Sequence, residues 1–372
     1  MKKIVFLTGT RADFGKLKSL INKVEGSNEF DAHIFVTGMH MLSKYGMTAN
    51  EVTKSGFKSI YRYINQHSGD SMDGILAKTI HGLSDYIKEI EPDMIVVHGD
   101  RVEAMAGAIV GSLNNILVAH IEGGEVSGTI DELIRHAVSK MSHLHFVCNE
   151  KAKQRLIQLG ELSSSIYIIG SPDLDIMTSI NLPSLDDVKL RYGIEFDKYA
   201  VFMYHPVTTD LDALPYNIKQ TVDAMLESDH NYVVIYPNND HGTDIIIKEL
   251  SRLEGNERFK IYPSLRFESF LTLLKNTTFM MGNSSAGVRE IPFYGLPSIN
   301  LGSRQDGRAK AKSIINVNEN CDDILNAIDL TGVSKLMPVR EFGNGNSDEL
   351  FFNELTKPML WNKAKQKVFV DL

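Results

Sequence analysis

The chain contains little cysteine: Cys148 and Cys321 are the only two in 372 residues. Two cysteines do not build a disulfide framework, so we expect a protein of a reducing cytoplasm. The sequence also lacks any apolar stretch near the ~20 residues that a membrane-spanning helix needs. The apolar run at the N-terminus ends at Thr8 and is too short for a signal-peptide core. These absences predict a soluble cytoplasmic protein with no membrane partner.

The chain also lacks an excess of basic residues. Its formal net charge is −8 and its pI is about 5.9. This balance argues against sequence-independent binding of nucleic acid, which needs a basic face. An anionic ligand would therefore need a local cluster of Arg, Lys and backbone N–H groups. The hydrophobic fraction of 43% is ordinary for a globular protein, and the length suits two domains.

The opening stretch "IVFLTGTRADFGKL" (residues 4–17) lacks both common phosphate-loop signatures. The P-loop pattern G-x-x-x-x-G-K-[ST] fails at Thr10 and Leu17, and the dinucleotide fingerprint G-x-G-x-x-G is incomplete. An ATPase or a simple NAD enzyme is therefore disfavoured. What remains is a tight turn that carries Arg11 and Lys16 to a helix N-terminus. An anion can bind there, or the two side chains can simply be solvated.

Short apolar runs alternate with helical patterns along the chain. In the first half the runs occupy residues 3–8, 32–37, 93–99, 115–122, 143–148 and 165–170. In the second half they occupy residues 199–205, 231–237, 258–263, 277–282, 296–302 and 313–317. Strands that are apolar at nearly every position are typical of sheets covered on both faces, so the alternation predicts doubly wound α/β domains.

The alternation breaks at residues 170–187, which contain two prolines, and we place an interdomain linker there. We expect a Rossmann-like domain over 1–171 and a second Rossmann-like domain over 172–347. An amphipathic helical segment over 348–372 would pack back across a domain surface. In such an architecture a ligand binds beyond the carboxyl ends of the strands, here in a cleft between the domains.

Acidic residues follow the predicted strands of the first domain. Asp100 ends "VVHGD", Glu122 lies in "HIEGGE", and Asp131 and Glu132 open the helix of "TIDELIRH". Structural roles are also available: Asp100 can cap a helix, Asp131 can complement the helix dipole, and Glu132 can form a capping box with Thr129. Crowded carboxylates, however, split their pKa values, which suits proton transfer at carbon.

Histidines near these acids raise the question of a metal. His98, His120, His143 and His145 follow or lie on predicted strands, but none has the tight zinc spacing of H-E-x-x-H. We therefore expect hydrogen-bonding core histidines and no metal.

The stretch "FMMGNSSAGVRE" in the second half resembles a phosphate cradle in its chemistry. A strand ends, and Ser284 and Ser285 lead into a predicted helix whose free N–H groups can hold a phosphate. Glu290, about a turn and a half into that helix, can accept both hydroxyls of a ribose. Arg304 and Arg308 can reach the phosphates. Alternatively, Ser285 is an ordinary N-cap and Glu290 is solvated.

Other polar residues follow the remaining strands of the second half. His205 precedes a proline, and Asn238 and Asn239 follow another strand, although Asn is also common in plain turns. Ser264 and Arg266 follow a third strand in "YPSLRF".

Taken together, residues 3–317 resemble the hydrolysing UDP-N-acetylglucosamine 2-epimerases of bacterial sialic acid synthesis. The segments that carry the resemblance occur in the family's order: "GTRADFGKL", "VHGDR", "HIEGGE", "DELIRH", "HPVTT", "YPNND", "GNSSAGVRE" and "GLPSINLGSRQ". The non-hydrolysing epimerases typically show G-T-R-P-E-x-I-K and H-V-E-A-G-x-R instead of the first and third segments. The resemblance therefore favours the hydrolysing branch.

The resemblance implies a glycosyltransferase-B type fold that binds UDP mainly through the C-terminal domain. It implies that Ser284 and Ser285 hold the diphosphate, that Glu290 holds the ribose, and that Asn238 lies near the uracil. Further phosphate contacts would come from His205, Arg11 and Arg304. The family's catalytic acids match Asp100, Glu122 and Asp131, and we count His205 with the catalytic groups. The expected substrate-binding set is completed by Lys16, Arg101, Glu132, Ser264 and Arg266.

The implied reaction is elimination followed by hydration, without a cofactor. Breaking the C1–O bond to UDP makes the C2 proton removable, and water then adds across the glycal to give N-acetylmannosamine. The same chemistry on a GDP- or UDP-linked diacetamido-trideoxyhexose is an alternative. A glycosyltransferase and a non-catalytic nucleotide-sugar sensor are further alternatives, since one fold hosts several functions. The family also suggests a homodimer or homotetramer.

Overall fold

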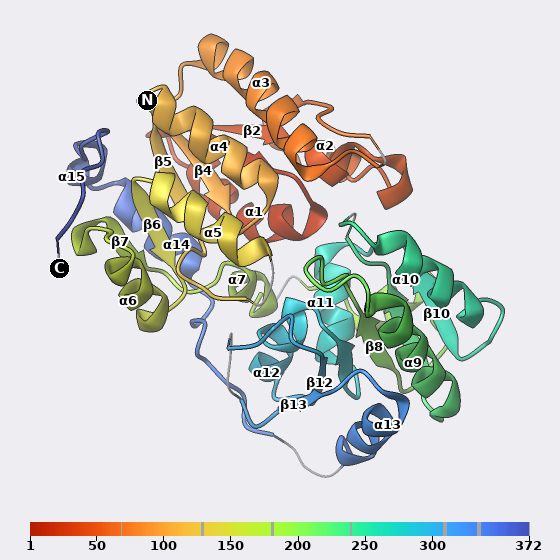
Figure 1. Cartoon of the computed structure of the whole chain (residues 1–372). Helices are drawn as coiled ribbons and strands as arrows, with labels where there is room; N and C mark the ends of the chain where they lie inside the picture. The colour runs from red at the N-terminus through yellow and green to blue at the C-terminus, as the bar shows by residue number, and fades with distance from the viewer. Residues whose placement is uncertain are drawn as a thin grey trace. The chain divides into compact units, whose positions relative to one another are not determined.

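The structure, a computed structural model, describes residues 1–67, 69–127, 130–179, 182–238, 240–307, 311–332 and 336–371. The chain divides into two compact units. The first comprises residues 1–125, 131–179 and 341–372, and the second comprises residues 126–130 and 180–340. Each unit is built on its own parallel sheet with helices packed around it (Figure 1). The predicted α/β class with two doubly wound sheets is confirmed.

The first sheet has seven parallel strands in the order β3-β2-β1-β4-β5-β6-β7. The strands are β1 (Lys2–Thr8), β2 (Phe30–Val36), β3 (Ser59–Arg62), β4 (Met94–His98), β5 (Leu117–Ile121), β6 (Leu144–Val147) and β7 (Ile166–Ile168). The helices of this unit are α1 (Arg11–Glu25), α2 (Ala49–Lys54), α3 (Met72–Ile90), α4 (Val102–Leu113), α5 (Ile130–Met141), α6 (Glu150–Gln158), α7 (Asp173–Met177), α14 (Ser347–Leu355) and α15 (Pro358–Trp361).

The second sheet has six parallel strands in the order β10-β9-β8-β11-β12-β13. The strands are β8 (Ala200–Met203), β9 (Tyr232–Ile235), β10 (Phe259–Tyr262), β11 (Met280–Gly282), β12 (Ser298–Leu301) and β13 (Ile314–Val317). The helices are α8 (Leu185–Tyr192), α9 (Leu214–Glu227), α10 (Thr243–Leu250), α11 (Phe267–Lys275), α12 (Glu290–Tyr294) and α13 (Cys321–Leu330). Among the described helices of both units, none is long and apolar enough to span a membrane.

Both sheets have the strand order of a dinucleotide-binding fold. The chain begins at a central strand, proceeds to one edge, and then crosses back to build the other half. The order reverses between β1 and β4 in the first sheet and between β8 and β11 in the second. Connections leave these neighbouring strands in opposite directions, so a crevice opens beyond their carboxyl ends. The fold therefore points to the residues that follow these strands.

The helices cover both faces of the first sheet because its strands are apolar on both. Ile4 and Phe6 pack with the buried residues of α1 and α14. The alternate residue Leu7 lies on the opposite face, against Gly107 of α4. A side chain at Gly107 would come within 2.9 Å of Leu7, so the glycine lets α4 approach the sheet closely.

The amphipathic helical segment that the sequence predicts over residues 348–372 is not one continuous helix. The structure has two short helices, α14 and α15, and Pro358 opens the second of them. Proline has no backbone N–H to continue a helix, and its fixed φ suits a first helical position. Phe351 of α14 is buried in the core of the first unit, and Trp361 stacks on Phe30 with ring centroids 5.8 Å apart.

Candidate active site

In the loop after β1, backbone N–H groups are hydrogen-bonded to side chains of the loop and of the first turn of α1. Thr10 caps α1, and the Asp13 carboxylate accepts the N–H groups of Gly9 at 2.9 Å and Thr10 at 3.1 Å. The Thr10 side chain in turn accepts the N–H of Asp13. These three N–H groups are therefore already bonded, and a bound anion would be held mainly by side chains such as Arg11.

The two basic residues of this loop have acidic partners. Arg11 pairs with Glu51 at 2.5 Å. Lys16 is buried, and its Nζ lies 3.5 Å from Oε2 of Glu122 and 3.3 Å from Oδ2 of Asp173. Lys16 thus lies between two carboxylates, one of which is a predicted catalytic acid. The other, Asp173, was not among the site residues that the sequence suggested.

Glu122 lies at the end of β5 in an unusual backbone conformation. Its φ is +64°, in the left-handed region that residues other than glycine rarely adopt, and the residue is 4% exposed. The hydroxyl of Ser171 donates to its carboxylate, and Nε2 of His98 lies 3.2 Å from it. A strained, buried carboxylate with several partners is typical of a functional position.

Asp100, after β4, pairs with a buried arginine. Arg135 of α5 is 1% exposed and donates through Nη2 to the Asp100 carboxylate and through Nη1 to the carbonyl of Glu125 at 3.2 Å. The first residue of α4 follows Arg101, which is the N-cap, so Asp100 does not cap that helix. Asp100 is therefore oriented by an ion pair.

The sequence analysis missed Arg135. The helical spacing of apolar residues in this stretch predicts a buried stripe of Ile130, Leu133, Ile134, Ala137, Val138 and Met141. In the structure Leu133 is 61% exposed, whereas Arg135 and Ser139 are buried beside Ile134 and Val138. The buried face of α5 is thus shifted by one residue. The sequence feature that could have identified Arg135 is its position directly beside the apolar stripe of the helix.

The two acids at the start of α5 are both half-buried. Glu132 lies 3.4 Å from Nε2 of His136, one helical turn further on. Asp131 precedes it in the first turn. Thr129, the expected capping partner of Glu132, lies outside the described residues. The structure therefore leaves Asp131 and Glu132 adjacent in the first turn of the helix that follows β5.

Arg101 points toward another buried acid. Its Nε lies 3.7 Å from Oε2 of Glu103, and burial raises the pKa of that carboxyl. Glu103 was not singled out from the sequence, and its side chain lies close to Gly9 in the loop after β1 and to Gly38 in the loop after β2.

The core histidines serve as hydrogen-bonding groups. His120 lies 2.8 Å from the carbonyl of Gly99 and 3.0 Å from the Ser139 hydroxyl, and burial lowers its pKa to about 3. His143 and His145 contact a backbone carbonyl and Glu161. Within the described ranges, no three His, Cys, Asp or Glu side chains are grouped to hold a metal ion.

In the second unit, Asn283 joins the ends of β8 and β11. Its side-chain Oδ1 accepts the N–H of His205 at 2.7 Å, and its Nδ2 donates to the carbonyl of His205 at 2.8 Å. Gly282, just before it, has φ +137°, and a side chain there would lie 1.9 Å from the Met203 carbonyl. The glycine is therefore required for this close approach.

The residues after Asn283 do not form the single helix that the sequence predicts. Residues Ser285–Gly287 make a 3₁₀ turn, and α12 begins only at Glu290. Glu290 is thus the first residue of a short helix, where it is buried. Ser284 caps the 3₁₀ turn by accepting the N–H of Ala286 at 3.4 Å.

Two polar residues after β12 contact the same loop. Nη1 of Arg304 and Nε2 of Gln305 donate to the Asn283 carbonyl at 3.2 and 2.9 Å. Gln305 was missed from the sequence, although it follows Arg304 directly. Arg308 and Asn239 lie outside the described residues.

The residues expected near the uracil lie at the ends of different strands. The N–H of Asn238 donates to Nδ1 of His205 at 3.2 Å, so these two lie together. Ser264 and Arg266 follow β10, the edge strand, where Arg266 donates its N–H to Tyr192 at 3.0 Å. They lie two strands from β8, which carries His205 at its end.

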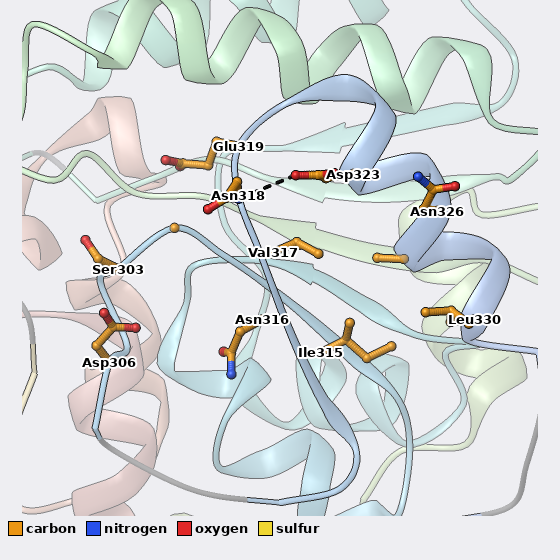
Figure 2. Close-up of a pocket in the computed structure, with 12 residues that line it drawn as sticks. Ser303, Asp306, Ile315, Asn316, Val317, Asn318, Glu319, Asp323, Asn326 and Leu330 are labelled. Carbon is orange, nitrogen blue, oxygen red and sulfur yellow. Dashed lines mark hydrogen bonds between the residues drawn. The ribbon is translucent and has the colours of Figure 1, made fainter.

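A separate hollow of about 670 Å³ lies at the ends of β12 and β13 (Figure 2). Asp306, Glu319 and Asp323 contribute carboxylates to its lining, which contains no Lys or Arg among the described residues. Burial raises the pKa of Glu319, which accepts from Tyr204 and Asn217. Such a lining does not suit a diphosphate.

These features define first a class of protein: an α/β protein with two Rossmann-like sheets, of the glycosyltransferase-B type, with acids after neighbouring strands of the first sheet and a polar loop after β11 of the second. The family follows from comparison. The model of the UDP-N-acetylglucosamine 2-epimerase family matches residues 22–356, and the chain belongs to that family.

Curated relatives cover nearly the whole chain. A UDP-N-acetylglucosamine 2-epimerase of Neisseria meningitidis serogroup B is 48% identical over 100% of both chains. A UDP-N,N'-diacetylbacillosamine 2-epimerase (hydrolyzing) of Legionella pneumophila is 34% identical over 94% of both chains. Polysialic acid biosynthesis protein P7 of Escherichia coli is 32% identical, over 91% of this chain and 88% of that protein.

A solved structure supports the fold. The UDP-GlcNAc 2-epimerase from Neisseria meningitidis bound to UDP-GlcNAc has a TM-score of 0.80 and covers 95% of this chain and 99% of that one. Because only 18% of residues are identical, this match is evidence for the fold alone.

Proposed function

We propose that the protein is a hydrolysing 2-epimerase that converts UDP-N-acetylglucosamine to N-acetylmannosamine and UDP, the first step of sialic acid synthesis. The observation that carries the proposal is the placement of the acids. Asp100 and Glu122 follow the neighbouring strands β4 and β5, and Asp131 opens the helix after β5. Membership of the epimerase family and the 48% identical Neisseria relative support the substrate.

The first half of the reaction is elimination. A carboxylate removes the proton from C2, the C1–O bond breaks, and UDP leaves with the electron pair. The departing diphosphate needs positive charge and hydrogen-bond donors in fixed positions. We assign this role to Arg304, His205 and the 3₁₀ turn at Ser285, and we assign the ribose to Glu290.

The second half is hydration of the glycal. The oxygen of water adds at C1, and a proton is delivered to C2 on the face opposite to the one that lost it. Two faces require two proton-transfer groups, which explains why the site needs more than one acid. Positioned acid–base groups of this kind contribute roughly 10²–10⁴-fold to rate. The products are N-acetylmannosamine and UDP, so atoms balance with one water consumed.

A second candidate is the same reaction on a nucleotide-linked diacetamido sugar. The 34% identical Legionella relative supports it, because that protein's name gives UDP-N,N'-diacetylbacillosamine as substrate. The chemistry at C1 and C2 is unchanged, and only the groups that contact C4 and C6 of the sugar differ.

The test is turnover in D₂O followed by NMR, with UDP-GlcNAc and the UDP- and GDP-linked diacetamido sugars offered separately. We expect UDP-GlcNAc to give free N-acetylmannosamine with deuterium at C2. Release of sugar that retains its original hydrogen at C2 would contradict the epimerase proposal. Transfer of the sugar to an added acceptor would indicate a glycosyltransferase, and binding of UDP without turnover would indicate a sensor.

A further inference from the structure

We infer that Ser171 and Asp173 are positioning residues for the catalytic carboxylate of Glu122, Ser171 through a direct hydrogen bond and Asp173 through Lys16. The inference rests on the proposed function, since it takes Glu122 as a group that moves a proton. Both residues lie in the segment whose prolines suggested a linker.

Ser171 is held rigidly at the end of the first unit's last strand. It is fully buried, and its backbone N–H donates to the carbonyl of Phe342 at 2.7 Å. Gly170 before it has φ +81°, and the chain at Gly343 passes directly over it. The Ser171 hydroxyl, which donates to Oε1 of Glu122, is therefore fixed in place before any substrate binds.

Glu122 needs such support because its backbone is strained. Its φ of +64° is unfavourable for a residue with a side chain, so contacts around it must hold the conformation. Its N–H donates to the carbonyl of Phe146 at 2.9 Å, which fixes the backbone. The Ser171 hydroxyl fixes one carboxylate oxygen, while Lys16 and His98 approach the other.

Lys16 connects Asp173 to Glu122. Asp173 is 1% exposed, and the Lys16 ammonium lies 3.3 Å from it and 3.5 Å from Glu122. One cation shared by two buried carboxylates stabilises each less than it would stabilise one alone. The ionisable neighbours of Glu122 also include His98 at 3.2 Å and His120, which stays neutral because burial lowers its pKa to about 3.

The two positioning residues should therefore shift the pH dependence in opposite directions. Removing the Ser171 hydroxyl takes a hydrogen bond from the Glu122 carboxylate and favours its protonated form. Removing the charge of Asp173 takes away one of the carboxylates that share the Lys16 ammonium, so Lys16 stabilises the ionised form of Glu122 more strongly. A residue that merely stabilised the fold would not produce opposite shifts.

The experiment compares wild type, Ser171→Ala, Asp173→Asn and the control Ser19→Ala. Ser19 also donates from α1 to a carboxylate of α7, at 3.0 Å, but its partner is Asp175. For each variant we would measure kcat, KM, the pH profile of kcat/KM and the Kd for UDP by calorimetry. Melting curves report folding.

We expect Ser171→Ala to lower kcat about 10-fold or more and to move the acidic limb of the profile upward by roughly half a pH unit or more. Asp173→Asn should lower kcat and move that limb downward. Both should leave the Kd for UDP within about 2-fold, and Ser19→Ala should match wild type.

Unshifted limbs, or shifts in the same direction, would overturn the inference. If Ser171→Ala does not fold, the pH profile of Asp173→Asn tests the inference by itself. A downward shift of its acidic limb supports the inference, and an unshifted limb overturns it. An inactive wild type would instead reject the proposed function, which separates the two failures.

Discussion

The backbone N–H of Asn238 donates to Nδ1 of His205 at 3.2 Å. Because Nδ1 accepts this hydrogen bond, the neutral ring carries its proton on Nε2. Asn283 holds the backbone of His205 on both sides, so the ring is fixed at the end of β8. The arrangement therefore places the proton of the neutral ring on Nε2.

We predict that His205→Asn lowers kcat/KM by roughly 10- to 100-fold, because it removes a positioned donor to the departing diphosphate. Most of the loss should fall on kcat, with a smaller change in the Kd for UDP. Steady-state kinetics and calorimetry measure the two effects. The exposed His81 on α3 provides the control, since His81→Asn should have no effect. A normal kcat in His205→Asn would contradict the assignment.

The pairing of Arg135 with Asp100 predicts a graded loss of activity. Asp100→Asn should lower kcat by about 100-fold or more, because it removes a carboxylate that moves a proton. Arg135→Lys keeps the charge but loses the fork that also serves the Glu125 carbonyl, and should lower kcat by roughly 10-fold. The rate of UDP release in a single turnover measures the loss in each of the two variants. Arg62→Lys, at the exposed end of β3, is the control; equal rates in all variants would reject this role for Asp100.

Asp131 and Glu132 can be separated by parallel substitutions. We predict that Asp131→Asn lowers kcat about 100-fold or more, whereas Glu132→Gln lowers it less than 10-fold, because Glu132 already pairs with His136 along the helix. Deuterium incorporation at C2 measures the chemical step directly. The reverse order of effects would assign the catalytic role to Glu132.

Nucleotide binding should depend on the loop after β11. We predict that Ser285→Ala and Glu290→Gln each weaken UDP binding by about 10-fold, since each removes a polar contact to the ligand. Calorimetric titration with UDP measures this. Asp323→Asn, in the hollow of Figure 2, is the matched control and should bind UDP as wild type does. Unchanged affinity in both site variants would place the nucleotide elsewhere.

Asp175 predicts a pH dependence of stability. Burial raises its pKa from 3.8 to about 6, and its carboxylate accepts the N–H groups of Ser347 and Asp348 at the start of α14. The folded state thus binds the proton more tightly than the unfolded state. Stability is therefore lost as pH rises from about 4 to about 6, by roughly 1–3 kcal/mol.

Urea unfolding followed at Trp361, the single tryptophan, reports on the first unit. Between pH 4 and pH 7, wild type should lose stability relative to Asp175→Asn, whose side chain does not ionise. The exposed Asp186→Asn serves as control and should follow wild type. A constant difference between wild type and Asp175→Asn across this range would contradict the assignment.

The sequence predicted the strands well because buried parallel strands are apolar at nearly every position. The runs at 3–8 and 199–205, for example, became β1 and β8. The strand missed was β3, whose residues Ser59–Arg62 are half-exposed at a sheet edge and carry no such pattern.

The site was harder to predict where long-range contacts determine the role of a residue. Asp100 and Glu122 were proposed from the sequence because each closely follows a strand: Glu122 comes directly after β5, and Asp100 comes two residues after β4. Arg135, Ser171 and Asp173 were missed, since their partners lie 35 to 157 positions away in sequence and no local pattern marks them. Pro172, in the predicted linker over 170–187, precedes a buried helix, α7. The chain passes from the first unit to the second at residues 179 and 180, within that range.

The first unit takes its final helices from the far end of the chain, and this affects the order in which the two units can fold during synthesis. On the ribosome, β1 and α1 emerge first, yet Phe351, which completes their core, is translated more than 300 residues later. Residues 180–340 form most of the second unit without interruption, so that unit can fold on the nascent chain while the first still awaits its last segment.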